Sequence, residues 1–134
     1  MAKIRHLAFF ADSPEEMAKF YVNAFGFEIT GRGKASVWLT DGYLDIALIQ
    51  PHDPKAPKGV NHFGFTLEPG ERAAVYAKLK ERGREPYRPP PGRPYIEDAA
   101  RDVDGNKFDL STTGLRSEDE QLERDQAPRD LAKV

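Results

Sequence analysis

The periodicity of apolar residues changes from a strand pattern to a helical pattern early in the chain. Residues 3–11 are rich in Ile, Leu and Phe and predict a strand. A helix is expected directly afterwards, because Ser13 is a suitable N-cap, Pro14 fits the first helical position and Glu16 completes a capping box. Gly26 is expected to end this helix.

Three short strands are expected next, over residues 27–31, 35–40 and 43–50. Glycine-containing turns at residues 31–34 and 41–42 separate them. Residues 51–58 contain three prolines and are predicted to be a linker.

The second half of the chain repeats this plan. The expected order is a strand, a helix, a weak strand, a rigid proline-rich loop and two further strands, over residues 59–67, 71–82, 84–88, 89–94, 95–101 and 106–111. His6 and His62 lie early in the first strand of each half, and each is followed at nearly the same distance by a helix-ending glycine. Such a repeat indicates that one βαβββ unit is used twice.

These patterns predict an α+β fold with one domain over residues 1–112. Module one would span residues 3–50, the linker residues 51–58 and module two residues 59–112. Residues 113–134 form a charged C-terminal tail with few large apolar residues, which is typical of a frayed or disordered segment.

Alternation along the strands sorts their side chains onto two faces. One face is apolar and is expected to pack against both helices, with Leu7, Phe9, Leu44, Ile46, Leu48, Phe63, Phe65, Leu67, Phe108 and Leu110. The other carries small and polar residues, including His6, Asp45, His62, Lys107 and Asp109. We therefore expect a mixed sheet that curves around a polar cavity, with the helices on its outer face.

Two imidazoles and a carboxylate on one concave face suit a divalent metal ion. His6, His62 and Asp109 would form a two-histidine, one-carboxylate set that leaves positions open for substrate and water. Alternatively, each histidine is simply a hydrogen-bonded structural residue and Asp109 bonds to a backbone turn. Asp45 is a possible fourth ligand, or it caps the turn at residues 41–42.

Composition narrows the functional classes. The chain has 134 residues, a net charge of −2 and no cysteine, so disulfide and thiolate chemistry are excluded. No basic patch or nucleic-acid motif is present, and no apolar run approaches the length that spans a membrane. A cytoplasmic protein without nucleic-acid or membrane partners is expected.

Four segments resemble the vicinal oxygen chelate superfamily, also called the glyoxalase/bleomycin-resistance/dioxygenase family; they are residues 4–9, 20–27, 61–65 and 102–110. The resemblance implies paired βαβββ modules in a U-shaped sheet around a metal, held by His6, His62 and Asp109. Asp109 stands where the family usually has Glu. The family's fourth-ligand position falls on Ala47, with Asp45 two residues earlier, so either Asp45 reaches the metal or three protein residues hold it.

The leading hypothesis is a metal-dependent small-molecule enzyme that chelates vicinal substrate oxygens, with lyase, isomerase or ring-cleaving dioxygenase chemistry. The ion would be Fe, Mn, Ni, Co or Zn, and Tyr95, Arg101 and Lys107 are candidate catalytic residues. The alternative is a metal-free binding protein of the bleomycin-resistance type, in which Trp38 and residues 89–94 grip the ligand. The resemblance also implies a homodimer.

Overall fold

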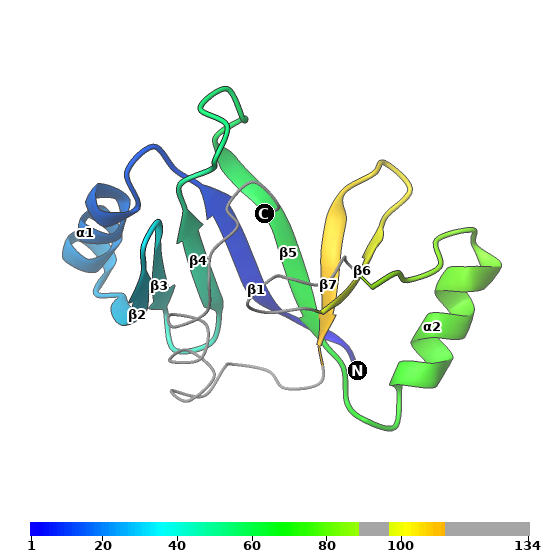
Figure 1. Cartoon of the computed structure of the whole chain (residues 1–134). Coiled ribbons are helices and arrows are strands. Elements are labelled where there is room, and N and C mark those ends of the chain that lie inside the picture. The colour runs from blue at the N-terminus through cyan, green and yellow to red at the C-terminus, as the bar shows by residue number, and fades with distance from the viewer. Residues whose placement is uncertain (89–96, 112–134) are drawn as a thin grey trace.

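A single seven-stranded mixed sheet and two helices make up the part of the chain that the computed structural model describes, residues 1–88 and 97–111 (Figure 1). The strand order across the sheet is β2-β3-β4-β1-β5-β7-β6. The strands are β1 (Lys3–Phe10), β2 (Glu28–Gly33), β3 (Ser36–Thr40), β4 (Asp45–Ile49), β5 (Gly59–Thr66), β6 (Asp98–Arg101) and β7 (Lys107–Ser111), and the helices are α1 (Pro14–Phe25) and α2 (Arg72–Glu81).

Local capping signals set the bounds of α1 as predicted. The Ser13 hydroxyl accepts a hydrogen bond from the backbone N–H of Glu16 at 3.3 Å, and Pro14 occupies the first turn. Gly26 ends the helix in the left-handed conformation, at φ 74°, where its N–H donates to the carbonyl of Val22.

The sheet has an approximate twofold arrangement about its centre. The first strands of the two modules, β1 and β5, pair antiparallel, and each has a parallel neighbour on its other side, β4 and β7 respectively. The repeat predicted from the sequence therefore becomes a pseudo-symmetric sheet whose two modules meet at the strands that carry the histidines.

Two details differ from the sequence prediction. The predicted strand at residues 84–88 is reduced to one β-bridge, between Tyr87 and Ala99. The first hairpin turn lies at residues 34–35 instead of 31–34, because β2 stays paired with β3 through Gly33 and Ser36. The predicted loop at 89–94, the start of the strand predicted over 95–101, and the tail lie outside the described residues.

Both helices lie on the apolar face of the sheet, as predicted. Side chains of α1 pack against Val37, Leu39, Ile46 and Leu48, and side chains of α2 pack against Leu67, Ala100, Phe108 and Leu110. The opposite face also holds an apolar cluster beside the histidines, formed by Ala8, Phe10, Trp38, Ala47 and Ile49. Neither helix is long and apolar enough to cross a membrane.

Candidate metal centre

Each candidate histidine follows a β-bulge at the centre of the sheet. In β1, Ile4 pairs with Phe65 while His6 pairs with Gly64, which makes Arg5 an extra residue. In β5, the partners of Phe9 and Ala8 are Val60 and His62, so Asn61 is extra there. Bulges turn side chains out of the regular alternation. They let the residue before each histidine reach the concave face.

The ring of His6 is held from several sides. Its Nδ1 atom lies 3.0 Å from the backbone carbonyl oxygen of Asp45, and because a carbonyl only accepts, Nδ1 carries the proton. The ring stacks on Trp38 with the ring centroids 6.1 Å apart. Gly64 leaves just enough room, since a Cβ built there would lie 3.0 Å from the Cβ of His6. His6 therefore presents Nε2 as its free lone pair.

His62 and Asp109 face each other. Nε2 of His62 lies 3.2 Å from Oδ2 of Asp109, and its Nδ1 lies 2.8 Å from Oδ1 of Asn61. The His62 and Asp109 side chains are 11% and 16% exposed, so both are largely removed from solvent. The two histidine rings are tilted at 50° with centroids 5.3 Å apart.

Ligand atoms of His6, His62 and Asp109 all lie within 4.8 Å of one another. The three residues that the sequence singled out therefore converge, although they are far apart in the chain. Atoms at this separation surround a point from which metal–nitrogen and metal–oxygen bonds of about 2.0–2.2 Å are reached with small side-chain adjustments.

The ionisation of the pair favours metal binding. Burial lowers the pKa of His62 below its ordinary value of 6.5 and outweighs the Asp109 carboxylate, which by itself would raise it. Burial tends to raise the pKa of Asp109, but the hydrogen bond and charge of His62 and the charge of Lys107 hold it below 3.8. Near neutral pH the site thus offers a neutral imidazole and an ionised carboxylate.

The pseudo-twofold arrangement identifies which positions mirror each other. Asp109 lies beside Gly64 in the β5–β7 register, and the equivalent pair in module one is Ala47 beside Ala8. Asp45 lies two residues before Ala47, beside His6, and the residue two before Asp109 in module two is Lys107. The position that mirrors Asp109 is therefore alanine, and it is fully buried.

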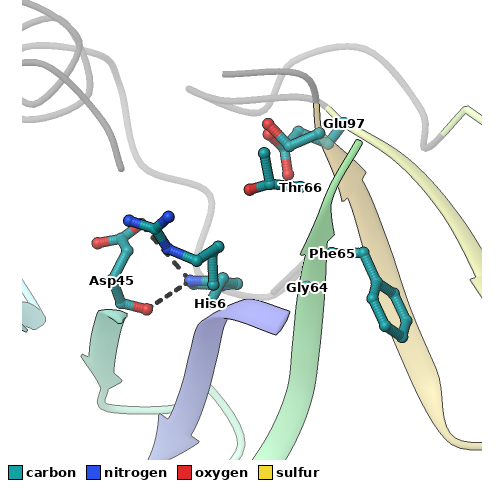
Figure 2. Close-up of a pocket in the computed structure, with 8 residues that line it drawn as sticks. His6, Asp45, Gly64, Phe65, Thr66 and Glu97 are labelled. Carbon is teal, nitrogen blue, oxygen red and sulfur yellow. Dashed lines mark hydrogen bonds and ion pairs between the residues drawn. The ribbon is translucent and has the colours of Figure 1, made fainter. Parts of the chain in front are cut away.

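A polar cleft adjoins His6 on its Asp45 side (Figure 2). His6 and Asp45 lie on one wall, Thr66 and Glu97 lie opposite, and the side chain of Phe65 points away toward the outer face. Arg5 also lines this cleft. Strict alternation would have placed it on the outer face with Leu7, so sequence analysis missed it; a bulge leaves no reliable signal in one sequence.

The remaining candidates have different surroundings. Lys107 lies beside the site on β7 and affects the pKa values of His62 and Asp109. Arg101 donates a hydrogen bond to the carbonyl of Gly105 at 2.8 Å and so fastens the β6–β7 turn. Tyr95 lies outside the described residues.

Solved structures of several enzymes share this fold. A methylmalonyl-CoA epimerase in complex with methylmalonyl-CoA and NH4+ matches with a TM-score of 0.59 and 18% identity over 87% of this chain and 99% of that one. The 2,3-dioxygenase LapB from Pseudomonas sp. KL28 matches at 0.63, with 20% identity over 81% and 40% of the two chains. The Mn(II)-bound glyoxalase from Novosphingobium aromaticivorans matches at 0.62, with 19% identity over 89% and 40%.

The chain thus spans nearly all of the epimerase but well under half of the dioxygenase and the glyoxalase. Comparison with curated protein sequences gives no match. The family model for the Glyoxalase/Bleomycin resistance protein/Dioxygenase superfamily matches residues 3–110. With the two-module mixed sheet described above, this match shows that the chain belongs to that superfamily.

Proposed function

We propose that this protein is a metal-dependent enzyme that binds vicinal oxygens of a small substrate at a divalent ion held by His6, His62 and Asp109. The observation that carries the proposal is the convergence of these three ligand atoms on the concave face. Neighbours of the same fold with enzymatic names, including a Mn(II)-bound glyoxalase, support it at the level of fold.

The surroundings of the three residues fit a metal. Histidine ligands commonly donate their second ring N–H to a carbonyl or carboxylate, which fixes the tautomer and the ring. Nδ1 of His6 does this with the Asp45 carbonyl, and Nδ1 of His62 is placed to do it with the side-chain oxygen of Asn61. The Nε2 lone pair of His62 then faces the ionised Asp109 at 3.2 Å, and a cation between them would relieve this contact.

We infer that three protein residues form the complete ligand set. The carboxylate of Asp45 lies on the Nδ1 side of His6, with Oδ2 3.6 Å from that atom, whereas the free lone pair is on Nε2. Asp45 is thus an outer partner that orients His6. Ala47 occupies the mirror position of Asp109 and supplies no ligand atom, so no fourth protein ligand comes from this side.

A divalent ion bound here would supply Lewis-acid polarisation of the substrate oxygens. The protein's own residues define where the substrate lies. Trp38 and Ala47 form an apolar wall beside the histidines, which excludes water from that side. Lys107 adds positive charge at the opposite side, where negative charge on a bound substrate would be stabilised.

The second candidate is metal-free ligand binding, and one feature favours it. If the Asn61 amide is turned by 180°, its NH2 group donates to Nδ1 of His62, and Nε2–H donates to Asp109. The three residues would then be a satisfied hydrogen-bonded cluster, with the Trp38 ring stacked on His6 beside it. The two functions therefore differ physically in which ring nitrogen of His62 carries the proton: Nδ1 in the metal-binding protein and Nε2 in the metal-free one.

The fluorescence of Trp38 provides the test, because it is the only tryptophan of the chain and stacks on His6. Mn2+ added to untagged protein should quench this emission saturably at about one equivalent, and elemental analysis should find a matching metal content. His62→Ala should lose both signals. His52→Ala is the matched control, because His52 is exposed in the linker. Absence of saturable quenching in the wild type, or the same titration curve with His62→Ala, would favour the metal-free binding protein.

A further inference from the structure

We propose that Arg5 is a specificity-determining residue that binds a carboxylate group of a monoanionic ligand in the cleft beside His6. The inference deepens the proposed function, since the cleft adjoins the candidate metal centre. It rests on the position of Arg5, on the free donors of its guanidinium and on the charges that share the cleft.

The bulge in β1 brings Arg5 to the concave side. Ile4 pairs with the outward-facing Phe65, and His6 pairs with Gly64, so the chain between them contains one residue more than its partner strand. Arg5 therefore lines the same cleft as His6, Asp45 and Thr66 instead of lying on the helix-covered face.

The guanidinium of Arg5 is held in place through only one of its nitrogen atoms. Its Nε atom donates to the carbonyl of Tyr43 at 2.8 Å, and its Cζ lies 4.1 Å from the centre of the Tyr43 ring. Among the residues that the structure describes, Arg5 forms no ion pair, although its charge adds to the backbone hydrogen bonds from Leu44 and Tyr43 that lower the pKa of Asp41. The four N–H donors on its terminal nitrogens thus remain for a ligand, in the planar fork that matches a carboxylate.

The other charges in the cleft restrict the class of ligand. Among the described residues that line it, Arg5 is the only cation and Asp45 and Glu97 are the acidic residues. A dianion, such as phosphate above its second pKa, would be repelled by both carboxylates. A monocarboxylate adds one negative charge and can accept two parallel hydrogen bonds from Arg5, so the cleft favours a monocarboxylate over phosphate.

The test is a titration of the 15N-labelled full chain with sodium butanoate, followed by amide and arginine Nε–Hε signals in NMR spectra. Butanoate should shift the signals of Arg5 and Thr66 saturably, both in the protein as purified and after chelation with EDTA. Inorganic phosphate at pH 8 should bind at least tenfold more weakly. Equal affinities for the two anions, or loss of the butanoate shifts after chelation, would overturn the proposal.

Three variants make the test specific. Arg5→Gln should weaken butanoate binding at least tenfold, and Arg5→Lys should weaken it severalfold, because lysine lacks the fork. Glu97→Gln should strengthen butanoate binding and reduce the preference for butanoate over phosphate. This variant tests the role of the cleft charges while Arg5 stays unchanged. Arg32→Gln is the control, because Arg32 pairs with Glu15 on the surface at 2.7 Å. Unchanged affinity in Arg5→Gln would refute the assignment.

Failure of this inference is separable from failure of the proposed function. Arg5→Gln should retain the Mn2+ titration curve that Trp38 fluorescence reports, since Arg5 contributes no metal ligand. If wild-type protein binds Mn2+ but Arg5→Gln binds butanoate normally, only the role of Arg5 is wrong. If wild-type protein does not bind Mn2+ while butanoate binding depends on Arg5, the metal centre is wrong and the anion site stands.

Discussion

Gly64→Ala should weaken both the fold and the metal centre, although alanine is the smallest possible addition. Gly64 lies beside His6 and beside Asp109 in the sheet register. An added Cβ would lie 3.0 Å from Cβ of His6 and 3.3 Å from its Cδ2. Carbon atoms in ordinary contact are about 3.5–4.0 Å apart, so His6 or the β5 backbone must move by about 0.5–1 Å.

The magnitude follows from how little His6 can adjust. Its ring is fixed by the bond to the Asp45 carbonyl and by Trp38. Overpacking of this kind costs about 1–3 kcal/mol, and the entropy that alanine removes from the unfolded chain returns about 0.4–1 kcal/mol. We therefore expect a net loss of about 0.5–2 kcal/mol in the free energy of unfolding. Displacing a ligand or its support typically weakens metal binding about 10–100-fold.

Urea denaturation and the Mn2+ titration of Trp38 fluorescence measure these two effects. Gly70→Ala is the matched control, because a Cβ at Gly70 meets no atom within 4 Å and its φ is not positive. This control should be neutral or slightly more stable and should bind Mn2+ like the wild type. The reasoning is refuted if Gly64→Ala also behaves like the wild type in both assays, because His6 would then tolerate the added atom.

Three other predictions concern the fourth-ligand position, α2 and pH. Ala47→Glu should strengthen Mn2+ binding at least tenfold, because it adds a carboxylate at the mirror position of Asp109. It should also make the metal-free protein less stable, because that position is fully buried. Ala47→Gln has nearly the same size without the charge, and so separates ligation by a carboxylate from the effect of size. Asp98 accepts hydrogen bonds from Arg72 and Tyr76 of α2 at 2.7 Å, so Asp98→Asn should cost about 1–2 kcal/mol and speed amide exchange in α2. The pKa of Tyr76, raised to about 12 by burial and then by Asp98, should fall in an ultraviolet titration of that variant. Because burial lowers the pKa of His62 in the folded protein, the unfolded chain binds a proton at His62 more readily than the folded chain does. The free energy of unfolding of the metal-free protein should therefore fall as pH drops through 6.5. His62→Gln should reduce this pH dependence in urea titrations between pH 5 and 8.

Local signals explain why most of the fold could be predicted from the sequence. The cap at Ser13, the helix end at Gly26, the sorting of β4 side chains onto two faces and the alternating burial in β7 follow from local sequence, and the structure reproduces them. The repeat predicted that His6 and His62 come together, because equivalent positions in a twofold arrangement meet near its axis. Few β-formers support the short strand expected at residues 84–88, and only the Tyr87 bridge forms there.

The features that the sequence did not reveal depend on long-range register. Arg5 and Asn61 reach the concave side because β1 and β5 each carry one extra residue opposite the other, which single-strand alternation does not contain. Likewise, the relation of Asp45 to Nδ1 of His6 depends on the parallel pairing of β1 with β4. The sequence left open whether Asp45 is a ligand, and the tautomer set by its carbonyl is the basis for assigning it an outer role.

The two sides of the site differ because the two modules carry different residues at equivalent positions. A perfectly repeated chain would place a carboxylate at both mirror positions, but module one has Ala47 where module two has Asp109. The second departure is electrostatic, because the residue two positions earlier is Asp45 in module one and Lys107 in module two. One side of the cluster of His6, His62 and Asp109 is therefore apolar and buried, beside Trp38, and the other carries the Asp109 carboxylate and a cation. Under the proposed function, this asymmetry favours the substrate orientation that places negative charge toward Lys107, whereas Arg5 lies on the Asp45 side of His6. Exchanging the charges, with Asp45→Lys and Lys107→Asp in one chain, should abolish the preference for butanoate over phosphate while His6 keeps its bond to the backbone carbonyl of residue 45, because a carboxylate in the Arg5 cleft becomes a cation; a retained preference would show that the charge at residue 45 does not set it.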